Sequence, residues 1–357
     1  MQITYGLLVA RTQGHRRGIL HGRAQLNDPG PRNADFPPIQ AAAATVSGPA
    51  ARLRPPQQSG SRLSGGPRPV TSLRFLVAES ETPEARAARR ASVGRSSGET
   101  YLGILRALSP GAALDLIRPA EEGAAVPDRA GLEGYDAVFL TGSPLHVYED
   151  TPEVRRQLDF MRAVFASGTP AFGSCAGLQV ATAAAGGTVR ANRRGCEAGF
   201  ARRITRTAAG QGHPLLAGRP EAYDAPAVHS DEVEQLPEGA VALAGNRVTA
   251  VQAAEIRSGR GVFWGVQYHP ELPLSEIAAA LRRQSAALME AGLARDEGEV
   301  EAYAARVDAL HRDPRRRDAA WQLGLDAQVA DPAQRSIELR NFVEHLVGPT
   351  RGQRGRE

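Results

Sequence analysis

A seven-residue stretch in the middle of the chain, Gly-Ser-Cys-Ala-Gly-Leu-Gln at positions 173–179, constrains the fold more than any other feature. It joins a short apolar run to an alanine-rich segment that predicts a helix reaching about residue 185. A side chain on such a strand-to-helix turn stands clear of the backbone, and the start of the helix beneath it favours a thiolate. Gly173 and Gly177 keep both neighbours small enough for the helix to pack against its strand. The stretch therefore predicts a sharp turn that presents Cys175 as a nucleophile.

Two residues far downstream supply the other groups that a cysteine nucleophile needs. His269 and Glu271 stand at i and i+2, which places them on one face of an extended segment. The imidazole can take the thiol proton and later protonate a leaving group, and the carboxylate can fix the imidazole tautomer. These residue types predict nucleophilic catalysis on an amide by Cys175. A lone histidine is more often structural, and we interpret His146 and His213 in that way.

Short apolar runs alternate with helical patterns from about Leu73 onward. Strands are expected at residues 74–78, 114–117, 137–140 and 170–172. A helix is expected from Thr151, which caps it, with Pro152 at its first position. The alternation predicts a flavodoxin-like, doubly wound α/β fold with a mostly parallel open sheet and helices on both faces. In such sheets the site lies beyond the carboxyl ends of the strands, where Gly142 and Cys175 fall.

The pattern changes twice more along the chain. Strands and turns between about Thr188 and Tyr268 predict a small antiparallel edge that returns His269 over Cys175. Residues after Ser275 have helical periodicity and many charges, which predicts a C-terminal helical appendage. The resulting expectation has four parts: a disordered Arg/Pro/Gly-rich extension at 1–72, a catalytic domain at 73–273, the helical appendage at 274–347 and a disordered tail at 348–357. A targeting segment is the alternative interpretation of the extension, whose presence in the mature protein stays open.

The two motifs together resemble a known family. Gly-Ser-Cys-x-Gly-Leu-Gln at 173–179 and Val-Gln-Tyr-His-Pro-Glu at 266–271 are similar to the class I (triad) glutamine amidotransferases, in particular to stand-alone GMP synthase-like domain proteins. Three further stretches match in order and spacing: 140–144, 195–199 and 229–233. Matches at several separated places are far more specific than one short pattern.

The resemblance implies hydrolysis of the side-chain amide of L-glutamine through a γ-glutamyl thioester, with ammonia passed to a synthetase on another chain. The implied catalytic residues are Cys175, His269 and Glu271. The oxyanion hole is expected at the backbone of Gly142, Ser143 and Ala176. Substrate binding is implied for Gln179, Glu197, Ser230 and Asp231.

Two other functions stay open. A hydrolase of γ-glutamyl amides or amines would use the same residues, differ only in its leaving group and need no partner. A non-catalytic glutamine-binding regulatory module would keep the fold and tolerate loss of the cysteine. A cysteine protease is disfavoured because the motifs describe a small, enclosed pocket.

Composition excludes several classes of protein. All 43 basic residues are arginine, so no lysine-containing phosphate-binding loop can form. Residues 1–73 carry a net charge of +7 and the remainder −3, so the overall basic balance does not indicate nucleic-acid binding. The two cysteines exclude a disulfide framework and suit a reduced cytoplasmic setting. No apolar run is long enough to span a membrane, and no Cys/His spacing predicts a metal site or a cofactor. A homo-oligomer is compatible with the sequence.

Overall fold

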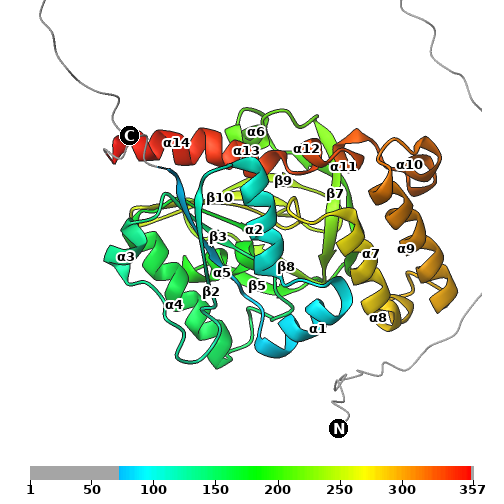
Figure 1. Ribbon diagram of the computed structural model, residues 1–357, viewed down its shortest axis with the longest axis horizontal. Helices are drawn as coiled ribbons and strands as arrows, with labels where there is room; N and C mark the ends of the chain where they lie inside the picture. Colours follow the sequence, from blue (N-terminus) through cyan, green and yellow to red (C-terminus); the bar gives the residue numbers. More distant parts are fainter. Residues whose placement is uncertain (1–71, 355–357) are drawn as a thin grey trace, which may run out of the picture. The chain divides into compact units, whose positions relative to one another are not determined.

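The computed structural model describes residues 72–354, and its central feature is a twisted sheet (Figure 1). Within this part of the chain, nine strands form one sheet in the order β2-β1-β3-β4-β11-β10-β9-β6-β7. The parallel strands are β2 (Ala113–Ile117), β1 (Arg74–Ala78), β3 (Ala137–Leu140), β4 (Ala171–Ser174) and β11 (Gly261–Val266). Their spatial order is the 2-1-3-4-5 order of flavodoxin-like sheets, which confirms the predicted fold class.

An antiparallel extension continues the sheet beyond β11. Its strands are β10 (Ala253–Ser258), β9 (Val241–Gly245), β6 (Glu197–Arg206) and β7 (Ala222–His229). A separate antiparallel pair is formed by β5 (Thr188–Ala191) and β8 (Asp231–Gln235). The predicted antiparallel edge is therefore present, and it is larger than expected.

Helices cover both faces of the parallel part, as predicted. The helices before β6 are α1 (Pro83–Val93), α2 (Ser97–Leu108), α3 (Arg129–Glu133), α4 (Pro152–Ser167) and α5 (Ala176–Ala184). Side chains alternate along a strand, so Phe75 and Val77 of β1 pack with α2, whereas Leu76 and Ala78 pack with α3, α4 and α5. Helix α4 begins as its sequence predicts, because the hydroxyl of Thr151 accepts a hydrogen bond from the backbone N–H of Val154.

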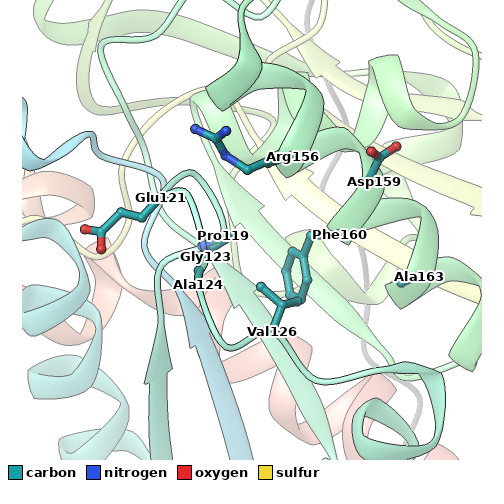
Figure 2. A pocket seen from close by; sticks show the side chains of 9 residues that line it. All are labelled: Pro119, Glu121, Gly123, Ala124, Val126, Arg156, Asp159, Phe160 and Ala163. Atoms are coloured by element: carbon teal, nitrogen blue, oxygen red, sulfur yellow. The ribbon is translucent and has the colours of Figure 1, made fainter.

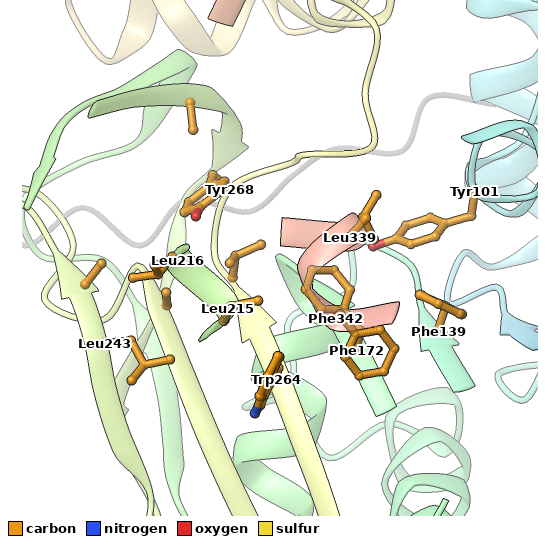
Figure 3. Packing of buried hydrophobic residues seen from close by; sticks show 14 of the residues in the cluster. Tyr101, Phe139, Phe172, Leu215, Leu216, Leu243, Trp264, Tyr268, Leu339 and Phe342 are labelled. Carbon is orange, nitrogen blue, oxygen red and sulfur yellow. The ribbon is translucent and has the colours of Figure 1, made fainter. Parts of the chain in front are cut away.

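The C-terminal helices divide into two groups. Helices α7 (Leu274–Arg283), α8 (Ser285–Glu290), α9 (Glu297–Arg312) and α10 (Arg317–Leu323) build an apolar cluster of their own that includes Phe200 of β6. The short helices α11 (Ala327–Ala330) and α12 (Pro332–Arg335) lead to α13 (Ile337–Phe342), which packs on the sheet (Figure 3). The ring of Phe342 lies 5.4 Å from that of Phe139 and 5.5 Å from that of Phe172, centre to centre. The end of the predicted appendage is thus part of the main hydrophobic core.

The predicted disordered tail from residue 348 is wrong for its first residues. A π-helical turn (Val343–Val347) continues into α14 (Gly348–Gln353). Arginines anchor this helix: Arg351 lies 3.8 Å from a carboxylate oxygen of Asp136, and Arg354 donates to the carbonyl of Tyr135 at 3.2 Å. Glycine and proline suggested an irregular chain, but the chain stays helical from the π-helical turn through Gly348 and Pro349.

Residues 1–71 of the predicted extension lie outside the described residues. Two short helical segments complete the description, α6 (Ala208–Gln211) and a 3₁₀ turn (Pro214–Leu216). None of the helices between residues 72 and 354 is both long and apolar enough to cross a membrane.

Candidate active site

The turn between β4 and α5 holds Cys175 in an unusual backbone conformation. Its φ is +54°, a region that residues other than glycine rarely adopt, and its thiol side chain is largely buried. The two glycines around it are required as predicted: a Cβ on Gly177 would lie 2.7 Å from the carbonyl oxygen of Leu140, and one on Gly173 would lie 2.9 Å from the backbone of Gly177. Close packing of helix on strand therefore forces the strained turn that presents the cysteine.

The sheet order brings the histidine to this turn. Strand β11 is the parallel neighbour of β4, with Val266 paired to Ser174. The backbone N–H of Cys175 donates to the carbonyl of Val266 at 2.8 Å, so the two strand ends are joined just where the site begins. His269 follows three residues later, and its backbone N–H donates to Pro226 of β7 at 2.8 Å. Parallel neighbours place their carboxyl ends at one edge, which is why residues 94 positions apart meet.

His269 and Glu271 form the predicted pair. Nδ1 of His269 lies 2.7 Å from Oε1 of Glu271, and both side chains are buried. Burial by itself would lower the pKa of His269, but the charge of Glu271 and hydrogen bonds with Cys175 and Glu271 outweigh it and raise the pKa to about 10. The imidazole is therefore protonated at neutral pH beside the thiol, which is the partner a thiolate nucleophile needs.

A serine inside the motif, which we did not predict to be functional, also holds the glutamate. The hydroxyl of Ser174 donates to Oε1 of Glu271 at 2.9 Å and lies 2.7 Å from the hydroxyl of Tyr101 on α2. All three side chains are buried. His269 and Ser174 thus both contact the same carboxylate oxygen, Oε1 of Glu271. Nothing in the sequence around Tyr101 marks it for this contact, because it lies 73 residues before Ser174.

The loop after β3 packs directly against the imidazole. A Cβ on Gly142 would lie 2.8 Å from Cε1 of His269 and 3.6 Å from Cβ of Cys175. The next residue, Ser143, accepts a hydrogen bond from the backbone N–H of Leu145 at 3.2 Å, so its side chain closes the loop. Ala176 is the first residue of α5, where backbone N–H groups have no partner within the helix. The predicted oxyanion groups therefore surround Cys175 on two sides.

A cavity of about 600 Å³ opens beside the cysteine. The predicted site residues that line it are Ser143, Cys175, Gln179, Glu197, Ser230 and Asp231. Those that do not line it are Gly142, Ala176, His269 and Glu271. The side-chain amide of Gln179 donates to Oε1 of Gln267 at 3.2 Å, which holds it one helical turn beyond the cysteine.

Glu197 reaches the cavity wall, but neighbouring side chains occupy its carboxylate. Oε2 accepts hydrogen bonds from His229 at 3.1 Å and from Thr249 at 3.0 Å, and Oε1 accepts one from Asn246 at 2.6 Å. Gln252 also donates to Oε2. A carboxylate has about four acceptor sites. Burial opposes the charge, yet the hydrogen bonds, with His229 foremost, lower the pKa of Glu197. This geometry favours a bracing role in the wall over direct contact with a substrate.

Asp231 differs from Glu197, because one of its two carboxylate oxygens has no hydrogen-bond partner among the described residues. Oδ2 lies 2.7 Å from Nδ1 of His146, whereas Oδ1 is buried and has no hydrogen-bond partner within residues 72–354. The hydrogen bond with Asp231 raises the pKa of His146, although partial burial opposes it. We predicted a structural role for His146, but its side chain lines the cavity beside Cys175 and so belongs to the site. His213 is structural as predicted, since its Nδ1 accepts from the backbone N–H of Leu215.

A second pocket, of about 310 Å³, lies between the loop after β2 and helix α4 (Figure 2). Its Arg156 donates to the carbonyl of Ala120 at 2.8 Å and to Glu153 at 3.2 Å, so neighbours already engage its guanidinium. The lining contains no cysteine or histidine. Among the described residues, no group of three or more His, Cys, Asp or Glu side chains is arranged to hold a metal ion. The chemistry of the fold therefore concentrates in the cavity beside Cys175.

Comparisons with known proteins agree on one family. Residues 105–287 match the family described as glutamine amidotransferase class-I. A γ-glutamyl-L-1-hydroxyisopropylamide hydrolase of a Pseudomonas species is 36% identical over 286 residues, which cover 79% of this chain and 95% of that protein. One of the subunits of a glutamine-hydrolysing GMP synthase, from Methanoculleus marisnigri, is 37% identical over 105 residues, covering 29% of this chain and 53% of that protein. The chain thus spans only about half of the length of that second relative.

A solved structure has the same fold. A glutamine amidotransferase of Thermotoga maritima superposes with a TM-score of 0.53 at 17% identity, covering 77% of this chain and 98% of that one. Strand order, the strained cysteine turn and these matches lead to one conclusion: the chain belongs to the class I glutamine amidotransferase family.

Proposed function

We propose that this enzyme hydrolyses the side-chain amide of L-glutamine, with Cys175, His269 and Glu271 as its catalytic residues. The observation that carries the proposal is the imidazole of His269, held by Glu271 at 2.7 Å and lying beside the cysteine turn. Hydrolysis of an amide needs a nucleophile, a proton donor for the departing amine and a site for the oxyanion. At this edge of the sheet, Cys175 is the candidate nucleophile, His269 is the candidate proton donor, and the backbone near Gly142 and Ala176 is the candidate oxyanion site.

The residues suggest a sequence of two half-reactions. The Cys175 thiolate attacks the γ-carbonyl carbon, and the backbone N–H groups of Ala176 and the 142–143 loop stabilise the oxyanion. The carbon–nitrogen bond then breaks as the imidazolium of His269 gives its proton to the amine, leaving a γ-glutamyl thioester. Water, deprotonated by the now neutral His269, attacks the thioester, and glutamate leaves as the thiol is restored.

The leaving group defines two versions of this function. Release of ammonia from glutamine to a synthetase on another chain is supported by the relative that belongs to a GMP synthase, although it matches only 29% of this chain. Hydrolysis of a γ-glutamyl amide of a larger amine, with no partner, is supported by the Pseudomonas relative, which matches over 95% of its length. The cavity of about 600 Å³ also lies in the range of sites for ligands larger than one amino acid.

One labelling experiment tests the shared chemistry. The protein would be treated with diazo-oxo-norleucine, a glutamine-like electrophile, and the modified residue located by mass spectrometry. We expect one label per chain, on Cys175, and protection by glutamine. Labelling of Cys196 instead, or labelling that glutamine does not slow, would overturn the proposal.

The raised pKa of His269 predicts the alkaline limit of activity. Because the imidazolium must protonate the leaving amine, kcat/KM for glutamine should persist up to about pH 10 and fall above it, as His269 loses its proton. Glu271→Gln removes the charge that raises this pKa, so the alkaline limb should move to lower pH. The pH profiles of the two proteins provide the measurement. A limb at the same pH in both would contradict the assigned pair.

Gly142→Ala should displace the imidazole. The added methyl group would lie 2.8 Å from Cε1 of His269, so the ring must shift. A displacement of about 1 Å costs on the order of 100-fold in rate, and we expect kcat for glutamine to fall by that factor. Gly103→Ala on the exposed side of helix α2 is the matched control, because a Cβ at that position would have no atom within 4 Å. Full activity of Gly142→Ala would show that the ring tolerates the methyl group.

Asp231→Asn should weaken substrate binding more than chemistry. We assign the carboxylate of Asp231, which lines the cavity beside Cys175, to the α-ammonium group of the γ-glutamyl substrate. Losing a hydrogen bond between charged groups should raise KM by about 10- to 100-fold, with a smaller change in kcat. Steady-state kinetics on glutamine measure this. Glu234→Gln, an exposed carboxylate on the same strand β8, should leave KM unchanged. Equal KM values for Asp231→Asn and the wild type would remove Asp231 from the binding site.

A further inference from the structure

We infer that helix α8 builds a subsite for an apolar substituent on the leaving amine, so that the preferred substrates are γ-glutamyl alkylamides rather than glutamine. The inference rests on the proposed function, because the subsite has a role only if Cys175 attacks a γ-glutamyl amide. It goes further in naming the residues that would select the amine.

The C-terminal helices supply one whole side of the active-site cavity. Gln284, Ala287, Leu288, Glu290 and Ala291, from α8 and the residues at its two ends, line the same cavity as Cys175. Leu288 and the residues after it lie beyond residues 105–287, the part of the chain that matches the family. The part of the wall from Leu288 onward therefore lies outside the matched core, whereas Gln284 and Ala287 lie at its end. A wall that differs from the core of a family is where substrate choice can differ as well.

The cavity has an apolar side and a polar side. Val228 of β7, Ala287, Leu288 and Ala291 contribute hydrocarbon, and the polar side chains of Gln284 and Glu290 in the same wall are exposed. The polar side is formed by residues such as Gln179, Asn192, Ser230 and Asp231. A γ-glutamyl amide is divided in the same way: its α-ammonium and α-carboxylate groups need polar partners, and an alkyl group on its amide nitrogen does not. If the polar end of the substrate lies on the polar side of the cavity, its alkyl group lies against α8.

Helix α8, which forms this wall, packs against α7 and α9 on the side away from the cavity. The side chain of Leu288 is buried in the cluster formed by α7, α8 and α9, together with Leu281 and Val300. Its other side faces the cavity, whereas Ala287 and Ala291 are exposed at the rim. Small side chains at two of the rim positions leave room for an alkyl group, and Leu288 provides the surface on which the group would pack. Each added methylene that leaves water for such a surface improves binding.

The test compares substrates of increasing amine size on the whole chain. We would measure kcat/KM for glutamine, γ-glutamylmethylamide, γ-glutamylpropylamide and γ-glutamylbutylamide. One methylene in an apolar pocket is worth about 10- to 200-fold in discrimination at best. We expect kcat/KM to rise along the series, with the butylamide at least about 10-fold above the methylamide.

Two variants on α8 locate the subsite. Ala287→Trp fills the rim and should remove most of the preference for the butylamide, about 10-fold or more, while glutamine hydrolysis changes by less than about threefold. Ala286→Trp is the matched control, since Ala286 is exposed on the same helix and does not line the cavity. It should leave both activities unchanged. Ala291→Phe, at the other end of the wall, gives a second test, and thermal unfolding verifies that each variant folds.

The outcomes separate the subsite from the catalytic assignment. Glutamine hydrolysis that depends on Cys175 but shows no increase with alkyl length would overturn the subsite and leave the proposed function standing. Ala287→Trp and Ala286→Trp with equal effects would likewise overturn it. No turnover of any γ-glutamyl amide by the wild type would overturn both.

Discussion

Cys175→Ala should lower kcat for glutamine hydrolysis by on the order of 10⁴-fold or more, because removing a nucleophile from a catalytic unit removes the covalent pathway altogether. The backbone oxyanion groups and the cavity remain in the variant. Glutamine binding should therefore change little, and isothermal titration of the variant with glutamine can measure the affinity without turnover. Steady-state assays of ammonia and glutamate release give the loss in rate.

Cys196→Ala is the matched control for this loss. Cys196 lines the same cavity, but partial burial and the nearby charge of Glu197 raise the pKa of its thiol, which makes it a poor nucleophile at neutral pH. We expect Cys196→Ala to keep nearly full activity. If Cys175→Ala kept its activity and Cys196→Ala lost it, the nucleophile would be misassigned. If neither variant lost activity, the non-catalytic binding module would become the better interpretation of the fold.

Glu338→Ala should destabilise the protein by about 3–5 kcal/mol, the usual cost of leaving one partner of a buried ion pair alone. The side chains of Arg219 and Glu338 are both completely buried. Nε of Arg219 donates to Oε1 of Glu338 at 2.7 Å, and Nη2 donates to Oε2 at 2.9 Å. Burial opposes the charge of Arg219, yet Glu338 raises its pKa above the ordinary value. Removing the carboxylate would leave a charged guanidinium in the core.

The carboxylate of Glu338 also joins the C-terminal helix α13 to the segment that carries His269. The hydroxyl of Tyr268, the residue before His269, donates to Oε1 of Glu338 at 2.7 Å. Tyr268 lies in the buried cluster that contains Leu339 and Phe342 (Figure 3). The variant should therefore lose activity at temperatures where it still folds, because the segment that carries His269 loses an anchor.

Urea unfolding curves measure the loss of stability, and two controls interpret it. Glu344→Ala removes an exposed carboxylate from the same C-terminal helical segment and should change the free energy of unfolding by less than about 0.5 kcal/mol. The double variant Arg219→Met, Glu338→Leu removes both charges and should recover much of the stability lost in Glu338→Ala. A loss of less than about 1 kcal/mol in Glu338→Ala would show that water or another group replaces the carboxylate.

Much of the fold follows from patterns contained within a few residues of the chain. Residues 74–78 and 137–140 form β1 and β3 as predicted, because continuous apolar runs are typical of strands buried on both faces. Thr151 and Pro152 begin α4 as predicted, since capping uses only local groups. The prediction for the tail from residue 348 is wrong because its helix depends on distant partners of Arg351 and Arg354, which no local pattern contains.

The candidate site likewise contains residues that local motifs predict and residues that only tertiary contacts reveal. Cys175, its two glycines, and His269 with Glu271 could be predicted, because each motif is short and its chemistry depends on spacing within the motif. Ser174, Tyr101 and His146 were not predicted as parts of the site, since their partners lie 97, 73 and 85 residues away along the chain. Glu197 was predicted to bind substrate, and only its neighbours in space reveal that its acceptor sites are already filled.

The sequence by itself predicted the sharp cysteine turn, the alternation of strands and helices in the parallel part of the sheet and the types of the proposed catalytic groups. Those depend on backbone sterics, hydrophobic periodicity and the chemistry of single side chains, all of which act over one or two turns of chain. Only the tertiary structure decided which carboxylates are free, what braces the glutamate of the pair and which helix closes the cavity. Such contacts depend on how strands and helices far apart in sequence pack together, and packing is settled by the whole core at once.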